Sequence, residues 1–188
     1  MKIGILALQG ACEPHEEKLR ALSIPSKRVL MPSHLEDLSG IILPGGESTT
    51  QIHLLKTNNL WEPLRDFVFS KPAWGVCAGA ILLAKTVTSP VQDSLGKMDL
   101  TIERNGFGRQ NESFESGLQS SIETWDNFWG TFIRAPRIKK LGERVVTLMT
   151  YQNEPVMVED GTTLVTTFHP ELGSSVKVHQ YFADKCHG

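Results

Sequence analysis

The sequence predicts an α/β protein in which helices flank a mostly parallel central sheet. In its first half, short apolar runs alternate with amphipathic segments, the pattern of a parallel sheet covered by helices. The chain has 188 residues, a usual length for one domain with a sizeable core. No repeat, low-complexity stretch or long Pro/Gly linker divides it. We therefore expect a single domain that covers residues 1–188.

The expected strands of the first half are short and apolar, as buried strands are. Pro44, Gly45 and Gly46 end one of them sharply. Pro14 suits the first turn of one helix, and Ser48 is placed to cap another. The predicted strands are residues 3–8, 28–30, 40–43 and 73–76, and the predicted helices are residues 14–22, 48–55, 60–69 and 78–85.

The second half is richer in strand patterns, which Pro and Gly interrupt. Residues 113–127 show no clear period, and we expect a loop there. The predicted strands are residues 97–102, 130–133, 145–151, 156–159 and 163–167, followed by a closing helix at residues 176–184.

Charge and hydropathy exclude several classes of protein. The formal net charge of −2 provides no global basic field for nucleic acid or an anionic membrane. No apolar run has the length that spans a bilayer. The apolar start of the chain is too short for a signal peptide, because Gln9 and Gly10 end it.

The cysteines indicate a reducing compartment. Cys12, Cys77 and Cys186 are odd in number and widely spaced, which is not a disulfide framework. The chain has no Cys-x-x-Cys pair and no trusted metal spacing among its histidines, so we expect no metal site. One of the three thiols could then be a nucleophile.

The strongest local motif places Cys77 between two glycines. Residues 75–79 read GVCAG and lie between a predicted strand and a predicted helix, as in a nucleophile elbow with Cys in the Ser position. Glycines permit this tight turn, and the backbone N–H of Ala78 would point toward a developing oxyanion. A buried, inert structural cysteine is the alternative, which the paired glycines disfavour.

A second motif, His169-Pro170-Glu171, follows the predicted strand at residues 163–167. In a doubly wound sheet the carboxyl ends of parallel strands share one edge, so His169 could reach Cys77. Glu171 could then hold the imidazole in the right tautomer. A solvated loop with an exposed Glu171 is the alternative when this motif is taken alone.

The loop at residues 43–50 reads LPGGESTT and follows a predicted strand. Its glycines would let backbone N–H groups approach a ligand. It lacks the Gly-Lys-Ser/Thr of a P-loop, and Glu47 would repel phosphate. A zwitterion with an ammonium and a carboxylate suits this loop better, and an ordinary turn is the alternative.

Two further cations stand near predicted strand ends. Arg104, in the ERNGFGRQ segment at residues 103–110, could pair with a carboxylate, although such a charged run is more often a solvated loop. Arg134 follows Ile133 at the end of a predicted strand and is a weak signal by itself.

These motifs together resemble the class I, triad-type glutamine amidotransferases. Within that class they resemble the glutaminase subunits of pyridoxal 5′-phosphate synthase. The elbow and His-Pro-Glu mark the broad class, and the other motifs mark the subunit. The matching stretches span nearly the whole chain in the expected order and are residues 6–10, 43–50, 75–79, 104–110, 132–136 and 168–172.

The resemblance implies a flavodoxin-like glutaminase domain and a role for each matched residue. Cys77 would be the nucleophile, His169 the base and Glu171 its orienting partner. The oxyanion hole would use the N–H groups of Ala78 and Gly46. Gln9 and Gly10 would lie near the site and respond to binding of the partner synthase subunit. The implied glutamine pocket comprises Gly46, Glu47, Ser48, Arg104, Ile133 and Arg134.

Two departures from the family pattern stand out. Val76 occupies the position before the nucleophile where the family usually has Thr, so a hydroxyl contact is lost. Residues 173–177, GSSVK, replace the acidic residues and Arg that often follow His-Pro-Glu-Leu. Neither departure touches the predicted triad.

The sequence therefore predicts a cytosolic glutaminase without a cofactor. It would hydrolyse L-glutamine to glutamate and ammonia through a cysteine thioester, and a synthase subunit would take the ammonia for pyridoxal 5′-phosphate. A glutaminase for another synthase, a cysteine peptidase or related hydrolase, and a non-enzymatic binding module are the alternatives. Cys12 and Cys186 are expected to be structural.

Overall fold

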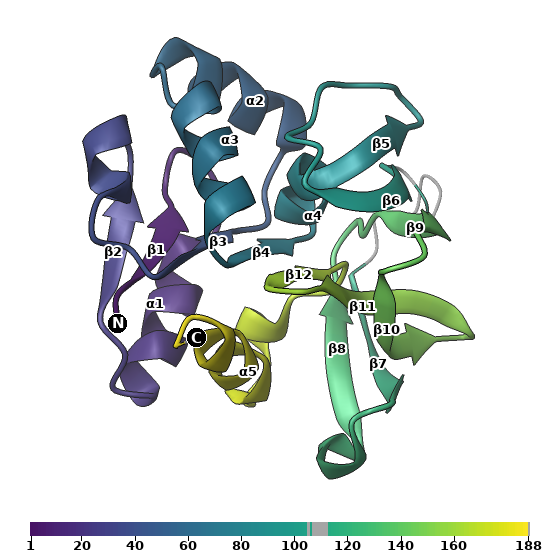
Figure 1. Ribbon diagram of the computed structural model, residues 1–188. Coiled ribbons are helices and arrows are strands. Elements are labelled where there is room, and N and C mark those ends of the chain that lie inside the picture. The colour runs from purple at the N-terminus through teal and green to yellow at the C-terminus, as the bar shows by residue number, and fades with distance from the viewer. Residues whose placement is uncertain (105, 107–112, 188) are drawn as a thin grey trace.

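A nine-stranded mixed sheet runs through the molecule (Figure 1). The computed structural model describes residues 1–104, 106 and 113–187. The strand order is β2-β1-β3-β4-β12-β11-β10-β7-β8. Neighbours from β2 to β12 are parallel, and neighbours from β12 to β8 are antiparallel. The parallel strands are β1 (Ile3–Leu6), β2 (Ser26–Val29), β3 (Gly40–Leu43), β4 (Ala73–Val76) and β12 (Thr163–Thr166); the others are β7 (Phe114–Ser120), β8 (Phe128–Phe132), β10 (Val146–Tyr151) and β11 (Glu154–Asp160).

Helices cover both faces of the parallel half (Figure 1). Alternate side chains of a strand point to opposite faces, so each face carries its own core. Ile41 and Leu43 of β3 belong to the core under α2, α3 and α4, whereas Ile42 belongs to the core over α1 and α5. The helices are α1 (Cys12–Ala21), α2 (Ser48–Thr57), α3 (Trp61–Ser70), α4 (Ala78–Leu83) and α5 (Lys177–Lys185).

A second, three-stranded sheet with the order β5-β6-β9 follows α4. It consists of β5 (Ala84–Thr88), β6 (Met98–Glu103) and β9 (Arg137–Leu141), and single 3-10 turns lie at η1 (Pro32–Leu35), η2 (Glu123–Trp125) and η3 (Pro170–Leu172). Within the described part of the chain, none of the helices is both long and apolar enough to cross a membrane.

The predicted α/β class with flanking helices is confirmed. The strands predicted at residues 40–43 and 73–76 have those bounds, and most other elements differ at their ends by a few residues. The predicted helix at residues 78–85 ends at Leu83, because Ala84 takes an extended conformation and pairs with Met98 of β6. Strand β9 was not predicted, because its run RIKKL is mostly basic.

The expectation of a loop at residues 113–127 was wrong. Strand β7 occupies Phe114–Ser120, pairs with β8 along most of its length and meets β10 at Gln119 and Ser120. Its composition of Glu, Ser, Gly and Gln conceals the strand, and only Leu118 is buried. Backbone pairing with two neighbours, rather than apolar content, forms this strand.

Candidate active site

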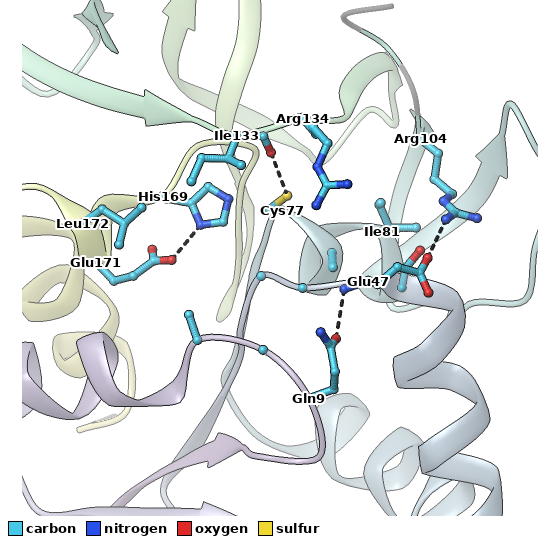
Figure 2. Close-up of a pocket in the computed structure, with 16 residues that line it drawn as sticks. Gln9, Glu47, Cys77, Ile81, Arg104, Ile133, Arg134, His169, Glu171 and Leu172 are labelled. Atoms are coloured by element: carbon cyan, nitrogen blue, oxygen red, sulfur yellow. Dashed lines mark hydrogen bonds and ion pairs between the residues drawn. The ribbon is translucent and has the colours of Figure 1, made fainter. Parts of the chain in front are cut away.

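The carboxyl ends of β1, β3, β4 and β12 meet at one edge of the sheet, because these neighbouring strands are parallel. A pocket of about 430 Å³ opens there (Figure 2). All twelve residues predicted for the site line it, namely Gln9, Gly10, Gly46, Glu47, Ser48, Cys77, Ala78, Arg104, Ile133, Arg134, His169 and Glu171.

Cys77 occupies a strained turn between β4 and α4. Its φ of 50° and ψ of −101° are unusual for a residue other than glycine, as at a nucleophile elbow. Its N–H donates to the carbonyl of Thr166 over 2.9 Å, which ties the turn to β12. Gly79 permits the tight packing, since a Cβ there would lie 1.9 Å from the carbonyl oxygen of Leu43.

The thiol of Cys77 is largely buried and faces the second half of the chain. Its Sγ donates to the carbonyl of Ile133 over 3.9 Å (Figure 2). Arg134 follows with a φ of 44°, a second strained backbone position beside the nucleophile. The sulfur therefore lies between the elbow and the turn that leaves β8.

His169 and Glu171 form a buried pair directly after β12. His169 Nδ1 lies 2.7 Å from Glu171 Oε1, and the His169 N–H donates to the carbonyl of Thr131 over 2.8 Å. A carboxylate can only accept, so Nδ1 carries the proton in this bond. The ring then turns Nε2 toward the side of the pocket that holds Cys77 (Figure 2).

The surroundings of the pair favour its charged form. Burial acts to lower the pKa of His169, but interactions with Cys77 and Glu171 outweigh it and raise this pKa to about 10. Nε2 itself has no hydrogen bond of normal geometry among the described groups. Burial acts to raise the pKa of Glu171, but the hydrogen bond from His169 and the His15 ring lower it overall. An imidazolium–carboxylate pair is expected at neutral pH.

Gly45 brings the loop after β3 directly against the catalytic ring. A Cβ at this position would lie 2.4 Å from Cε1 and 3.2 Å from Nδ1 of His169. Real Cβ atoms do not approach other atoms that closely, so either the ring or the loop would have to move. Glycine at position 45 is therefore a condition for the position of the His169 ring.

We expect Gly45→Ala to lower kcat about a hundredfold, because a displacement of about 1 Å at a reacting group costs that much. Ammonia release from glutamine measures the effect. Gly117→Ala in β7 is the matched control, since a Cβ there would meet no atom within 4 Å. Wild-type kcat for Gly45→Ala would show that the ring tolerates the extra carbon.

Glu47 replaces Ser48 as the cap of α2, so the predicted capping role of Ser48 was wrong. The Glu47 carboxylate accepts from the N–H groups of Thr49 and Thr50 at 3.2 and 2.7 Å. A longer side chain one residue upstream can fold back onto these free N–H groups. The Ser48 hydroxyl instead donates to Gln92 Oε1 over 3.0 Å.

Glu47 also connects the two sides of the pocket. On one side, Arg104 Nη2 lies 2.6 Å from Glu47 Oε1. On the other, the backbone N–H of Glu47 donates to Gln9 Oε1 over 2.9 Å (Figure 2). Burial acts to raise the pKa of Glu47, but hydrogen bonds from Thr49 and Thr50 lower it to about 2. The pocket thus holds a charged carboxylate and a guanidinium side by side.

Part of the ERNGFGRQ motif, residues 105 and 107–110, lies outside the described residues.

The two departures from the family pattern, Val76 and residues 173–177, both lie in well-packed or hydrogen-bonded segments. Val76 is buried in β4. In the altered loop the carbonyl of Gly173 accepts from Lys18 Nζ, and Lys177 Nζ donates to the carbonyl of Thr124 over 2.8 Å. These contacts anchor the loop beside the triad.

The pocket also includes residues that sequence reasoning missed, namely Ala11, Gly45, Ile81 and Leu172. Leu172 is 46% exposed, an apolar side chain at the pocket beside Glu171. Gly45 was visible in the Pro-Gly-Gly turn, but its approach to His169 was not. Cys12 and Cys186 are buried and do not line this pocket.

A solved structure supports the likeness over the whole chain. It is titled "Crystal structure of glutamine amidotransferase", has a TM-score of 0.91 and 42% identity, and covers 99% of both chains. The model of the SNO glutamine amidotransferase family matches residues 5–188. The chain belongs to this family. The resemblance inferred from the motifs is therefore confirmed.

Curated relatives are similar along nearly their full length. A protein of Thermotoga neapolitana named "Pyridoxal 5'-phosphate synthase subunit PdxT" is 44% identical over 185 residues, 98% of each chain. A protein of Dictyoglomus turgidum with the same name is 44% identical over 188 residues, 99% of each chain. A solved structure of a Thermoplasma acidophilum protein described as "a putative gmp synthase subunit a protein" shares the fold, with 17% identity, a TM-score of 0.68, and coverage of 100% of this chain and 94% of that one.

Proposed function

We propose that this chain is the glutaminase subunit of a pyridoxal 5′-phosphate synthase. It hydrolyses L-glutamine to glutamate and ammonia, and the partner synthase subunit incorporates the ammonia. The arrangement of Cys77, His169 and Glu171 at the sheet edge carries the proposal, since it unites a strained nucleophile with an oriented base. Relatives named as subunits of this synthase, at 44% identity over nearly the full chain, support the choice of partner.

The proposed reaction proceeds in two acyl-transfer steps. The proton of the Cys77 thiol is held by His169, and the resulting thiolate attacks the side-chain amide carbon of glutamine; the tetrahedral intermediate then collapses as the C–N bond breaks. His169 gives a proton to the departing ammonia, which leaves a thioester on Cys77. His169 then removes a proton from water, which attacks the thioester and releases glutamate. Glu171 holds the His169 ring throughout, since its Oε1 is bonded to Nδ1.

We propose that the backbone N–H groups of Ala78 and Gly46 hold the oxyanion, a role worth several kcal/mol in such enzymes. Both residues line the pocket beside Cys77. Gln9 bonds the N–H of Glu47, directly after Gly46, so a change at Gln9 and Gly10 would act on that loop. This connection supports a response of Gln9 and Gly10 to the partner.

The glutamine pocket would use Gly46, Glu47, Ser48, Arg104, Ile133 and Arg134. Glu47 and Arg104 offer opposite charges to the ammonium and carboxylate of an amino acid, and both line the cavity that contains Cys77. In the described conformation they pair with each other, so glutamine would exchange this pair for pairs of its own.

We expect Arg104→Lys to raise the KM for glutamine about tenfold and to change kcat less. Lysine keeps the charge but loses the planar fork that binds a carboxylate in two places. Steady-state kinetics with the synthase subunit present measures both constants. Arg144→Lys is the control, because Arg144 is an exposed residue that pairs with Asp160. An unchanged KM for Arg104→Lys would show that Arg104 does not bind the carboxylate of glutamine.

Release of ammonia and glutamate, with and without a pyridoxal 5′-phosphate synthase subunit, tests the function. Turnover that the subunit stimulates, and that Cys77→Ala loses, is the expected result. Stimulation by a different synthase alone would mean another amidotransferase. Turnover of peptides or esters without any partner would mean a cysteine hydrolase, and no turnover or thioester in any condition would mean a binding module.

We propose a cytoplasmic location for this glutaminase. All three cysteines are free and buried, and a reducing compartment maintains such thiols. Burial raises the pKa of the Cys186 thiol to about 12 and also raises that of Cys12. Cell fractionation of the tagged chain tests the location, and recovery outside the cytoplasmic fraction would contradict it.

A further inference from the structure

The triad carboxylate has a second buried neighbour that the mechanism above does not use. Glu171 Oε1 is bonded to His169, whereas Oε2 has no hydrogen-bond partner among the described groups. His15 Nε2 faces this oxygen at 3.7 Å and likewise has no hydrogen-bond partner among the described groups. The exposed fraction is 3% for Glu171 and 0% for His15, so water does not readily supply the missing bonds.

His15 is in turn bonded to a third buried imidazole. Its Nδ1 lies 2.9 Å from Nε2 of His179, which is also 0% exposed. His15 comes from α1 and His179 from α5, two helices on the same face of the sheet (Figure 1). The indole of Trp74 meets both rings edge-on, with ring centres 5.5 Å from His15 and 4.8 Å from His179.

The chemistry of these rings selects one tautomer for His15. Burial lowers the pKa of His15 to about 4 and that of His179 to about 2, so both rings are neutral at neutral pH. One N–H must therefore serve the bond between them. If His179 Nε2 donates it, the proton of His15 lies on Nε2 and faces the carboxylate. The opposite choice would leave a lone pair of His15 against Glu171, which is repulsive in a buried site.

We propose that His15, with its tautomer held by His179, is a positioning residue for Glu171. The N–H of His15 directs Oε2, so that Oε1 remains in line with Nδ1 of His169 while that ring gains and loses its proton. The inference rests on the proposed glutaminase function. It adds a row of side chains, from His179 through His15 to Glu171, that reaches from α5 to the triad.

The charged and titratable groups around this row define its pH behaviour. The groups that face Glu171 are His169 and His15. Those that face His15 are Glu171, His169 and His179, and those that face His179 are His15 and Lys18. The ammonium of Lys18 is itself bonded to the carbonyl of Gly173. His15 stabilises the carboxylate form of Glu171, so its loss should make Glu171 easier to protonate as pH falls.

The test compares His15→Leu with His15→Gln in the complex with the synthase subunit. Leucine removes the polar contact, whereas glutamine keeps a side-chain N–H. For His15→Leu we expect kcat to fall roughly tenfold to a hundredfold, because the change leaves the buried Oε2 of Glu171 without the polar group that faces it. KM should stay within about twofold. The acid limb of the kcat/KM profile should move to higher pH, and His15→Gln should restore most of kcat.

Cys12→Ala is the matched control, because Cys12 lies one turn earlier on α1 and its thiol bonds the backbone carbonyl of Leu6 rather than a group of the triad. It should leave kcat and the acid limb unchanged. If His15→Leu does not fold, His179→Leu carries the test, since it leaves the His15 tautomer unheld and should move the acid limb in the same direction.

Wild-type kcat and an unmoved acid limb in a folded His15→Leu or His179→Leu protein would overturn the proposal. Equal losses in His15→Leu and His15→Gln with an unmoved acid limb would also overturn it, since that pattern means packing alone. Failure of the proposed function is a different result, because the wild-type complex itself would then release no ammonia from glutamine.

Discussion

Cys77→Ala is expected to lower glutamine hydrolysis by roughly 10⁴-fold or more, because no other group in the pocket can form the thioester. The substituted side chain is small and buried at the elbow, and alanine fits the same backbone turn with no added volume. Ammonia and glutamate release with the synthase subunit present measure the loss. Mass spectrometry after rapid quenching should show the acylated chain in the wild type and none in Cys77→Ala.

Cys186→Ala is the control for that experiment. Cys186 is a buried free thiol at the end of α5, and burial raises its pKa to about 12, which keeps it protonated and unreactive. The Cys186→Ala variant should retain glutamine turnover even if some stability is lost. Turnover within tenfold of wild type in Cys77→Ala would remove Cys77 from the role of nucleophile.

Glu171→Gln is expected to lower kcat by roughly 10³- to 10⁴-fold, as loss of the orienting carboxylate does in a comparable triad. The amide can present an N–H toward Nδ1 and so favour the wrong tautomer of His169. The variant should also lower the pKa of His169, because the Glu171 carboxylate is one of the groups that raise it to about 10. NMR titration of the His169 ring measures this shift directly.

The pH dependence of stability follows from the same pair. The stabilisation from His169 is complete below its ordinary pKa of 6.5 and is lost as pH rises through about 10. The stabilisation from Glu171 is present above its ordinary pKa of 4.5 and is lost as pH falls through its lowered value. Denaturant titrations of wild type and Glu171→Gln should therefore differ most between these limits.

Glu154→Gln is the control for Glu171→Gln, since Glu154 is a partly exposed carboxylate that pairs with Arg137 of β9 and does not line the pocket. It should leave both kcat and the His169 pKa unchanged. An unchanged His169 pKa in Glu171→Gln, together with wild-type kcat, would show that the carboxylate does not orient the ring.

Local sequence predicted the α/β class and part of the pocket, and the family resemblance added residues such as Gln9, Gly10 and Ile133. Strands β3, β4 and β12 are short and fully buried, and their carboxyl ends lead into the Pro-Gly-Gly loop, Cys77 and His169 respectively. Parallel strands place their carboxyl ends at one edge, so the topology alone brings these segments together. No knowledge of side-chain packing was needed for that step.

The cap of helix α2 and the pairing of strand β7 could not be predicted from sequence patterns. Ser48 and Glu47 are both plausible caps of α2, and only the folded loop shows that the Glu47 carboxylate reaches Thr49 and Thr50. Strand β7 is polar along most of its length, so its periodicity is weak. Its backbone groups are satisfied by neighbours from distant segments, which no local window contains.

The sequence by itself determined which groups could react and on which edge they would gather. The tertiary structure decided how closely they approach. Gly45 lies against His169, and His15 faces Glu171, although each pair is far apart along the chain. Such contacts depend on how helices and loops pack over the sheet to within an ångström, and periodicity and turn chemistry specify only the order and direction of the elements.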